Sequence, residues 1–266
     1  MEVKAKKSLG QNWLKDEEVL QRIIQDASLS GEDVVLEIGP GQGALTEKLA
    51  AACKKVVAIE LDDRLVPILE NKFSQNSRVE IIHGDILRIN LPELIAKQGM
   101  RGRGYKVVAN IPYYITAPII RLLLETTYPP KEIYLLVQKE VAERIVASPG
   151  AMSVLAVSVQ YYADARYLFT VCKESFYPVP KVESAVVKIV LNDQEESVNA
   201  DGAKRFFKVV RAGFSAKRKT LANNLAASLQ LDKKSIEDGL AEMGFSKAVR
   251  AQELSVQDWK KLAKKL

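Results

Sequence analysis

The stretch Glu37-Ile38-Gly39-Pro40-Gly41-Gln42-Gly43 decides the fold class of this 266-residue chain. It joins a short apolar run, residues 33–38, to a helical pattern that begins near Ala44. Glycines let the backbone turn sharply and approach a ligand closely, and open α/β sheets bind ligands at the carboxyl ends of their strands. The spacing is G-x-G-x-G, whereas dinucleotide folds have G-x-G-x-x-G, which disfavours an NAD site.

Further apolar, β-branched runs follow this first one at intervals long enough for crossover helices. Together they predict five parallel strands, at residues 33–38, 56–60, 79–83, 106–109 and 133–137. Helices are expected after the cap Asp16 and over residues 153–162. The runs 165–171 and 184–191 lie too close together for a crossover helix, so they predict an antiparallel pair at one edge. The expected fold is a Rossmann-like α/β sheet.

The polar, acidic segment 192–202 is typical of a linker. We therefore expect two domains, residues 1–194 and residues 203–266. The second domain is predicted to be small and all-helical. Its expected helices cover residues 203–229, 233–243 and 255–266, with Gly244 as a C-cap and Ser255 as an N-cap.

Composition excludes several classes of protein. The chain is 47% hydrophobic, yet no run of about 18 uncharged apolar residues occurs, and the N-terminus lacks a signal-like apolar run. We expect a soluble, cytoplasmic monomer. Cys53 and Cys172 form no C-x-x-C pair and His83 is the single histidine, so neither a disulfide framework nor a metal site is expected.

Positive charge is concentrated at the C-terminal end. Residues 201–266 hold 15 Lys/Arg and 7 Asp/Glu, whereas the whole chain has a net charge of only +6. Because binding to phosphates is driven largely by counterion release, such a segment favours a polyanionic partner, most commonly nucleic acid. The alternative interpretation of this basic segment is a helix surface exposed to solvent.

The tetrapeptide Asn110-Ile111-Pro112-Tyr113 follows the fourth predicted strand. It places a side-chain amide, a stiffened carbonyl and an aromatic ring together. The exocyclic amine of a nucleobase is a poor nucleophile because its lone pair is delocalised into the ring. Two acceptors that hold its hydrogens can draw the nitrogen toward a reactive, tetrahedral geometry. The motif therefore predicts N-methylation of a flat amine.

Carboxylates end the two strands that follow the glycine loop. Glu60 lies 21 residues after Gly39, where a carboxylate can accept hydrogen bonds from ribose hydroxyls. Asp85 follows the third strand, at a position suited to an adenine amine. No G-x-x-x-x-G-K motif occurs, which argues against a nucleotide triphosphatase.

Four segments resemble one family: Gln11–Leu14, Asn110–Ile115, Phe176–Ala185 and Arg211–Leu221. With these four segments and the glycine loop, the chain closely resembles the ribosomal RNA adenine dimethylases. The resemblance is strongest to their bacterial small-subunit (16S), KsgA-type branch. The resemblance covers nearly the whole chain. It implies a class I methyltransferase fold, S-adenosyl-L-methionine as cofactor, and dimethylation of two adjacent adenosines in the 16S rRNA of an immature small subunit.

The resemblance also implies roles for individual residues. Trp13 stands where the family usually has Phe, and Lys217 where Arg is common. Expected at the target amine are Asn110, Ile111, Pro112, Tyr113 and Phe176. Expected at the cofactor are Asn12, Leu14, Gly39, Gly41, Glu60, Leu61, Asp85, Ile86 and Asn110. Expected at the RNA backbone are Lys6, Lys7, Arg101, Arg103, Arg211, Lys217, Arg218 and Lys219.

Three other hypotheses also fit parts of the sequence. A dimethylase of large-subunit (23S) rRNA would share the N-terminal domain, although Glu183–Val186 and the C-terminal segment favour the small-subunit enzyme. A ribosome assembly factor could retain the fold and act mainly by binding. A DNA adenine methylase usually has Asp-Pro-Pro-Tyr, so Asn110 and Ile111 argue against it.

Overall fold

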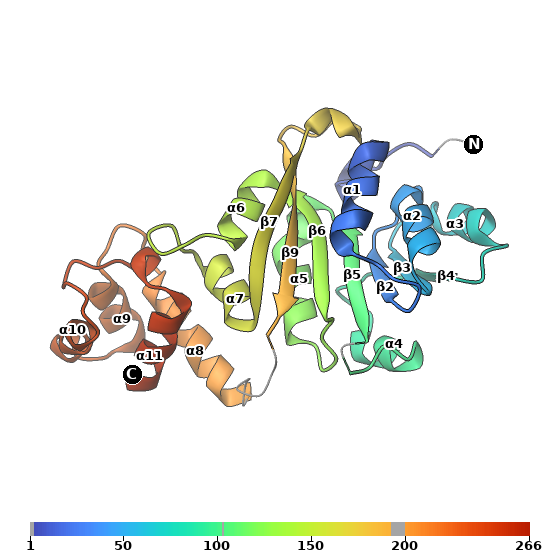
Figure 1. Ribbon diagram of the computed structural model, residues 1–266. Helices are drawn as coiled ribbons and strands as arrows, with labels where there is room; N and C mark the ends of the chain where they lie inside the picture. The colour runs from blue at the N-terminus through green and yellow to red at the C-terminus, as the bar shows by residue number, and fades with distance from the viewer. Residues whose placement is uncertain (1–2, 103, 193–199) are drawn as a thin grey trace. The chain divides into compact units, whose positions relative to one another are not determined.

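The computed structural model of the chain describes residues 3–102, 104–192 and 200–266 (Figure 1). The chain divides into two compact units. The first unit runs to Ala142 and also contains Ala165–Leu191, and the second contains Glu143–Asp164 and the residues from Asn192 onward. Within the described ranges, no helix has the length and apolar character needed to cross a membrane.

The first unit is built on a mixed sheet with the strand order β4-β3-β2-β5-β6-β9-β7. Strands β2 to β6 are parallel, and β9 runs antiparallel to β6. The strands of this sheet are β2 Val34–Ile38, β3 Lys55–Glu60, β4 Val79–His83, β5 Tyr105–Asn110, β6 Glu132–Gln138, β7 Ala163–Val171 and β9 Ser184–Leu191. The predicted fold class is confirmed, and each predicted strand is present to within two residues.

Helices before, between and after the parallel strands supply part of the core. They are α1 Glu17–Ala27, α2 Ala44–Ala52, α3 Val66–Phe73, α4 Leu91–Lys97, α5 Thr116–Glu125 and α6 Lys139–Ile145, the last of which crosses the boundary between the units. Leu20 of α1 and Leu49 of α2 are buried together with Val35 and Val56 of the sheet. As predicted, Asp16 caps α1, because its side chain accepts hydrogen bonds from the backbone amides of Glu18 and Val19.

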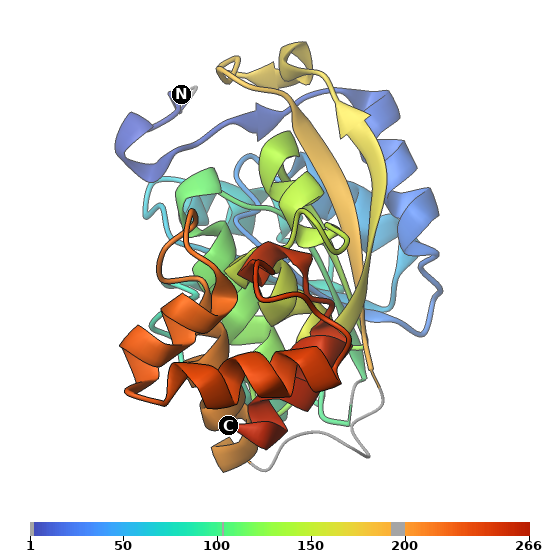
Figure 2. The same cartoon turned by 90° about the vertical axis from the view of Figure 1, so that its left-hand side faces the viewer.

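A second, two-stranded sheet was not predicted. Strand β1, Trp13–Leu14, pairs antiparallel with β8, Phe176–Tyr177. The backbone amide of Lys15 continues this contact by donating to the carbonyl of Ser175 at 2.9 Å. Two segments that lie far apart in the sequence therefore lie side by side (Figure 2).

The second unit is helical, with a core around the fully buried ring of Trp259. Its helices are α7 Val154–Tyr162, α8 Ala200–Gly213, α9 Leu221–Leu229, α10 Lys233–Glu242 and α11 Val256–Lys265. Met152 and Val157 belong to this core, and the amides of Gly150 and Met152 donate to the carbonyl of Gln252. The segment 143–164 therefore packs with the C-terminal helices.

The predicted helix over residues 203–229 is in fact two helices, α8 and α9. The chain turns after Gly213, where a Cβ atom would lie 2.4 Å from the ring of Trp259. The buried side chain of Asn224 donates to the carbonyls of Gly213 and Ala216, and Thr220 caps α9. These polar contacts replace helical hydrogen bonds across the turn. Short 3-10 helices lie at Lys7–Leu9, Tyr113–Ile115, Lys173–Ser175 and Ala251–Glu253.

Candidate active site

A cavity opens at the carboxyl edge of the parallel strands in the first unit. It holds about 750 Å³ of space, part of which is open solvent. Most of the residues predicted at the cofactor and the target amine line it: Asn12, Gly39, Gly41, Glu60, Leu61, Asp85, Ile86, Asn110, Ile111, Pro112 and Tyr113. Parallel strands bring their carboxyl ends to the same edge, which is why residues so far apart in the sequence meet here.

The glycine loop and Glu60 form one hydrogen-bonded unit in the cavity wall. Gly39 and Gly41 have φ angles of +71° and +60°, which residues other than glycine rarely adopt. Glu60 accepts from the amide of Gly41 at 3.0 Å and from the amide of Asp62 at 2.8 Å. Burial nevertheless raises the pKa of Glu60 above its usual value. The two amides fix the position of the Glu60 carboxylate, but they do not offset the effect of burial on its pKa. Such a group is expected where a ligand donates further hydrogen bonds.

The side-chain amide of Asn110 has a defined orientation. Its Nδ2 donates to the carbonyl of Asn12 at 3.0 Å. A carbonyl can only accept, so the nitrogen faces Asn12 and Oδ1 is left as an acceptor. Among the described residues, none donates a hydrogen bond to this oxygen. The residue therefore presents an open lone pair in the cavity wall.

The N-terminal segment is fastened across this edge of the sheet by a polar chain. Gln11 Nε2 donates to Asp62 Oδ2 at 2.9 Å, and Gln11 Oε1 accepts from the amide of Lys6 at 2.7 Å. Asp62 is buried and also receives two hydrogen bonds from the guanidinium of Arg64. These Arg64 bonds hold the pKa of Asp62 far below its usual range. The anchor is therefore an ionised carboxylate at neutral pH.

Sequence reasoning missed several residues of the cavity wall. Gln11, Trp13, Gly10 and Tyr114 line the cavity but carried no predicted site role. A Cβ atom at Gly41 would lie 2.8 Å from Trp13, and one at Gly10 would lie 3.2 Å from the Tyr114 ring, so both rings are packed directly onto glycines. The available signal was position, because Gln11 and Trp13 flank Asn12 and Tyr114 follows Tyr113 in the motif segments.

Asp85 stands at the end of β4, on the rim of the cavity. Its Oδ1 accepts from the amide of Leu87 at 3.0 Å, and its Oδ2 lies 3.5 Å from Nε of the exposed Arg88. The neighbouring Ile86 is buried and supplies an apolar wall. No cluster of three or more His, Cys, Asp or Glu side chains suited to a metal ion occurs in the part of the chain that the structure describes.

Phe176 and Leu14 do not line the cavity. Both belong to the buried core of the first unit, where Phe176 has 0% and Leu14 has 7% of its surface exposed. The cause is the β1–β8 pairing, which sets Leu14 opposite Phe176. A ring that is already buried cannot stack on an incoming base without leaving the core, so the structure gives the predicted target role of Phe176 no support.

The basic residues predicted to hold RNA in the first unit occupy different edges of the sheet. Lys6 and Lys7 are exposed in the N-terminal segment that also carries Gln11. Arg101 is exposed as well, but it precedes β5 and therefore lies at the amino edge. A six-residue strand separates the two edges by roughly 20 Å. Arg103 lies outside the described residues.

The remaining predicted RNA contacts belong to the helical unit. Arg211 is exposed on α8, and Lys217, Arg218 and Lys219 are exposed in the turn before α9. The amide of Lys219 donates to the carbonyl of Ala216 at 3.1 Å, and that carbonyl also accepts from Asn224. The three adjacent cations are thus displayed on a turn that the buried Asn224 holds in shape.

The sequence of the chain is similar to the sequences of known proteins. A family model described as ribosomal RNA adenine dimethylase matches residues 2–266. The ribosomal RNA small subunit methyltransferase A of Dehalococcoides mccartyi is 44% identical over 260 residues, covering 98% of this chain and 88% of that protein. The protein with the same description from Shouchella clausii is 42% identical over 262 residues, covering 97% and 88%.

Solved structures agree with the fold over both units. A dimethyladenosine transferase from Plasmodium falciparum matches with a TM-score of 0.78 at 29% identity, covering 94% of this chain and 95% of that one. The 23S rRNA methyltransferase ErmE matches with a TM-score of 0.76 at 25% identity, covering 96% and 99%. The chain belongs to the ribosomal RNA adenine dimethylases, a family of S-adenosylmethionine-dependent methyltransferases.

Proposed function

We propose that the protein methylates the N6 amines of two adjacent adenosines near the 3′ end of 16S rRNA, giving N6,N6-dimethyladenosine during small-subunit biogenesis. Family membership and the small-subunit descriptions of its relatives support this substrate. The single observation that carries the chemistry is the fixed amide of Asn110, whose Nδ2 is taken by Asn12 and whose Oδ1 remains an acceptor in the cavity wall.

The cavity suits S-adenosylmethionine in shape and in its donor set. A Cβ atom at Gly39 would have the Asn110 carbonyl, 3.8 Å away, as its one neighbour within 4 Å, so the glycine leaves room at the cavity floor. Glu60 would accept hydrogen bonds from the ribose hydroxyls, Asp85 would accept one from the adenine amine, and the buried Ile86 would pack against the base. When bound, this cofactor supplies a methyl group that its sulfonium already activates, so the protein needs no strong base.

The residues of the tetrapeptide position the target amine. Asn110 Oδ1 and the carbonyl of Ile111 accept its two hydrogens, which localises the nitrogen lone pair. Pro112, with φ of −57°, limits the freedom of the chain just beyond that carbonyl. Catalysis then consists mainly of holding nitrogen and methyl carbon in line.

Tyr113 provides the aromatic surface for the target base. Stacking of one base on an aromatic side chain contributes about 1–3 kcal/mol, which offsets the cost of removing the adenine from its stack in the RNA. The second methylation starts from N6-methyladenine, which has only one N6 hydrogen. The acceptor pair therefore grips both hydrogens in the first step and a single hydrogen in the second, and the proton lost in each step passes to water.

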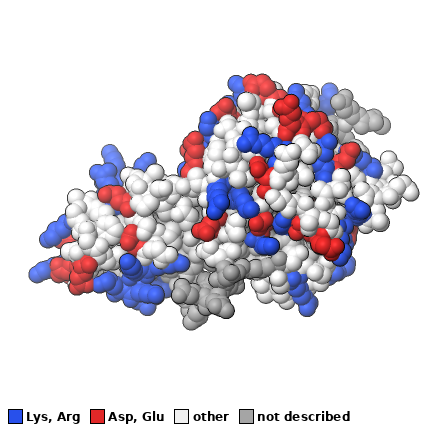
Figure 3. All heavy atoms as spheres, in the orientation of Figure 1, with Lys and Arg blue, Asp and Glu red and all other residues white. Residues whose placement is uncertain are grey.

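Basic residues of both units bind the RNA backbone in this proposal. The support is strongest for Lys217, Arg218 and Lys219, because three adjacent exposed cations stand on a turn with fixed hydrogen bonds. On the visible face of the helical unit, Lys and Arg side chains are interspersed with acidic ones (Figure 3). Reversing the three charges should weaken RNA binding and flatten its salt dependence. An unchanged salt slope would remove this turn from the interface.

The direct test uses ribosomal subunits that lack the modification. Purified protein is incubated with labelled cofactor and either small or large subunits, and the RNA is digested and analysed by mass spectrometry. We expect dimethyladenosine in small-subunit RNA at two adjacent positions. Label confined to the large subunit would instead favour the activity named for the structural relative ErmE. Binding to small subunits with no label would favour an assembly factor.

A further inference from the structure

A pair of hydroxyl groups joins the tetrapeptide Asn110–Tyr113 to the start of β9. Tyr113 Oη and Ser184 Oγ lie 2.6 Å apart, although the two residues are 71 positions apart in the chain. Ser184 is fully buried, and Tyr113 is half-buried with its ring in the cavity wall. Burial also raises the pKa of Tyr113, so its hydroxyl keeps its proton and remains available as a donor at neutral pH.

The direction of β9 explains why Ser184 lies at the carboxyl edge of the parallel strands. Because β9 runs antiparallel to β6, its first residue lies opposite Gln138, the last residue of β6. A parallel strand would have its first residue at the amino edge. The start of β9 is also tied in place, since the Lys139 amide donates to the carbonyl of Glu183 at 3.1 Å and Lys139 Nζ pairs with the Glu183 carboxylate at 2.8 Å.

Tyr113 is consequently held at both ends. Its backbone carbonyl accepts from Thr116 Oγ1 at 3.1 Å, and its hydroxyl is bonded to Ser184. A tyrosine side chain has two rotatable bonds, and fixing the far end of the ring restricts both of them. The ring therefore borders the cavity in one orientation before any base arrives.

We propose that Ser184 is a positioning residue that fixes the ring of Tyr113 for stacking on the target adenine. This inference rests on the proposed function, because it assigns Ser184 a role in the same site. Ser184 touches neither cofactor nor target, and it acts only through the hydroxyl of Tyr113. Its loss lets the ring turn, so the base is held less well in line with the methyl group.

The test is a double-mutant cycle with Ser184→Ala, Tyr113→Phe and the double variant. Either single change removes the same hydrogen bond, and we expect each to lower kcat on small subunits roughly fivefold. The double variant should be no slower than the slower single variant. Cofactor affinity, measured by calorimetry, should stay within about twofold. Multiplicative losses in the double variant would overturn the proposal, as would single variants with unchanged kcat.

Ser175→Ala is the matched control. Ser175 is also a buried serine of the first unit, and its hydroxyl donates to Asp16 at 2.8 Å, away from the cavity lining. The kcat of the Ser175→Ala variant should equal that of the unaltered protein when both are compared at the same folded fraction. A loss equal to that of Ser184→Ala would mean that deleting any buried hydroxyl lowers kcat, which would also overturn the proposal.

A second readout separates this inference from the proposed function. An RNA fragment with 2-aminopurine at the target position reports stacking by fluorescence and cannot be methylated at N6. We expect Ser184→Ala and Tyr113→Phe to change the fluorescence of the bound fragment equally. Equal signals for the original protein and Ser184→Ala would overturn the positioning role. Failure of the proposed function would instead appear as absent methylation by the unaltered protein.

Discussion

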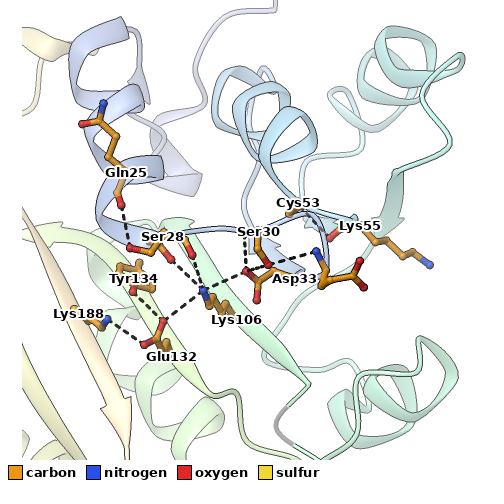
Figure 4. A network of polar contacts seen from close by, with 12 residues as sticks. Gln25, Ser28, Ser30, Asp33, Cys53, Lys55, Lys106, Glu132, Tyr134 and Lys188 are labelled. Atoms are coloured by element: carbon orange, nitrogen blue, oxygen red, sulfur yellow. Dashed lines mark hydrogen bonds and ion pairs between the residues drawn. The ribbon is translucent and has the colours of Figure 1, made fainter.

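The two edges of the first unit's sheet both contain buried ionisable side chains, but they differ in how fully these groups are paired. At the amino edge, Lys106 and its partners form a closed network (Figure 4). At the carboxyl edge, Glu37 and Glu60 are buried near the cavity with weaker compensation. The difference indicates which buried polar groups hold the fold together and which have capacity left for a ligand.

The amino-edge network satisfies every member that it contains. Lys106 Nζ donates to the carbonyls of Ala27 and Ser28 at 3.1 and 3.2 Å, and to Asp33 at 3.3 Å. Its charge also faces Glu132, which is paired with Lys188 at 3.0 Å. The network thereby ties the end of α1 to three strands.

The pKa values at the amino edge show this pairing. Burial alone would raise the pKa of Asp33, but hydrogen bonds from Ser30 and the charge of Lys106 outweigh it and leave the pKa below its usual value. Burial also acts to raise the pKa of Glu132, and hydrogen bonds from Lys188 and Tyr134 reverse that effect. Both carboxylates are ionised and paired with cations, so neither has capacity left for a ligand.

At the carboxyl edge the balance is opposite for Glu37 and Glu60, whereas Asp62 is paired with Arg64. Burial raises the pKa of Glu37 to about 8, and the neighbouring charge of Glu60 acts in the same direction. Glu37 Oε2 is buried without a hydrogen-bond partner among the described residues. Perturbed carboxylates with uncompensated burial gather at functional sites, and here they stand beside the cavity.

Breaking the amino-edge network should produce the largest change in stability. Lys106→Met leaves Asp33 and two helix-end carbonyls without their cation, and removing one partner from a buried ion pair costs roughly 3–5 kcal/mol. We expect the free energy of unfolding in urea to fall by about that amount. The control is Lys54→Met, which breaks the exposed pair with Glu32 at 3.8 Å and should cost less than about 1 kcal/mol. Equal losses in the two variants would contradict the comparison.

The buried Glu37 at the carboxyl edge should make the free energy of unfolding depend on pH. Because the pKa of Glu37 is about 8 when folded and 4.5 when unfolded, the unfolded chain loses this proton first as pH rises. Stability therefore falls between these two pH values, by at most about 1.4 kcal/mol per pH unit for one group. Glu37→Gln cannot ionise, so its free energy of unfolding should fall less steeply from about pH 5 to about pH 8. Parallel curves for the two proteins would show that Glu37 is not buried as a neutral acid.

Removing the aromatic wall should affect turnover and spare the cofactor. Tyr113→Ala deletes a stacking surface worth about 1–3 kcal/mol, so kcat/KM for the RNA should fall by roughly one to two powers of ten. Cofactor affinity should stay near normal, since Glu60 and the glycine loop are untouched. Tyr177→Ala, which removes an exposed ring outside the cavity lining, is the control and should leave kcat/KM unchanged. Full activity of Tyr113→Ala would mean that stacking is misassigned.

The smallest effect is expected at the anchor of the N-terminal segment. Gln11→Ala removes one hydrogen bond to Asp62, while Arg64 keeps that carboxylate paired. A net loss of about 1 kcal/mol corresponds to cofactor affinity weakened roughly fivefold, measurable by calorimetry. Gln21→Ala, on the exposed face of α1, serves as the control. If the two variants bind the cofactor equally well, the anchor does not contribute to cofactor binding.

Local sequence was sufficient for most of the first unit. The strands were predictable because β-branched apolar runs alternate with helical patterns. The start of α1 was predictable because Asp16 is a favourable N-cap residue. The gathering of Asn110, Glu60 and Asp85 was predictable as well, since each follows a parallel strand. Confirmed predictions of this kind need only local pattern and a rule about strand ends.

Long-range contacts account for what was missed. The core position of Phe176 comes from its pairing with Leu14, and its expected role at the target amine stays a prediction. The break between α8 and α9 depends on Asn224 and on the Trp259 ring, neither of which lies at the break itself. The packing of residues 143–164 with the C-terminal helices has no local signature either.

The sequence by itself determined the order of strands and helices, the glycine turn and the chemical character of the tetrapeptide, because these depend on neighbouring residues. Only the tertiary structure decided that Asn12 orients Asn110, that Gln11 reaches Asp62, and that Ser184 meets Tyr113. Each of these contacts joins segments separated by 50 residues or more. Their geometry follows from sheet topology and side-chain packing, which local residue patterns do not encode.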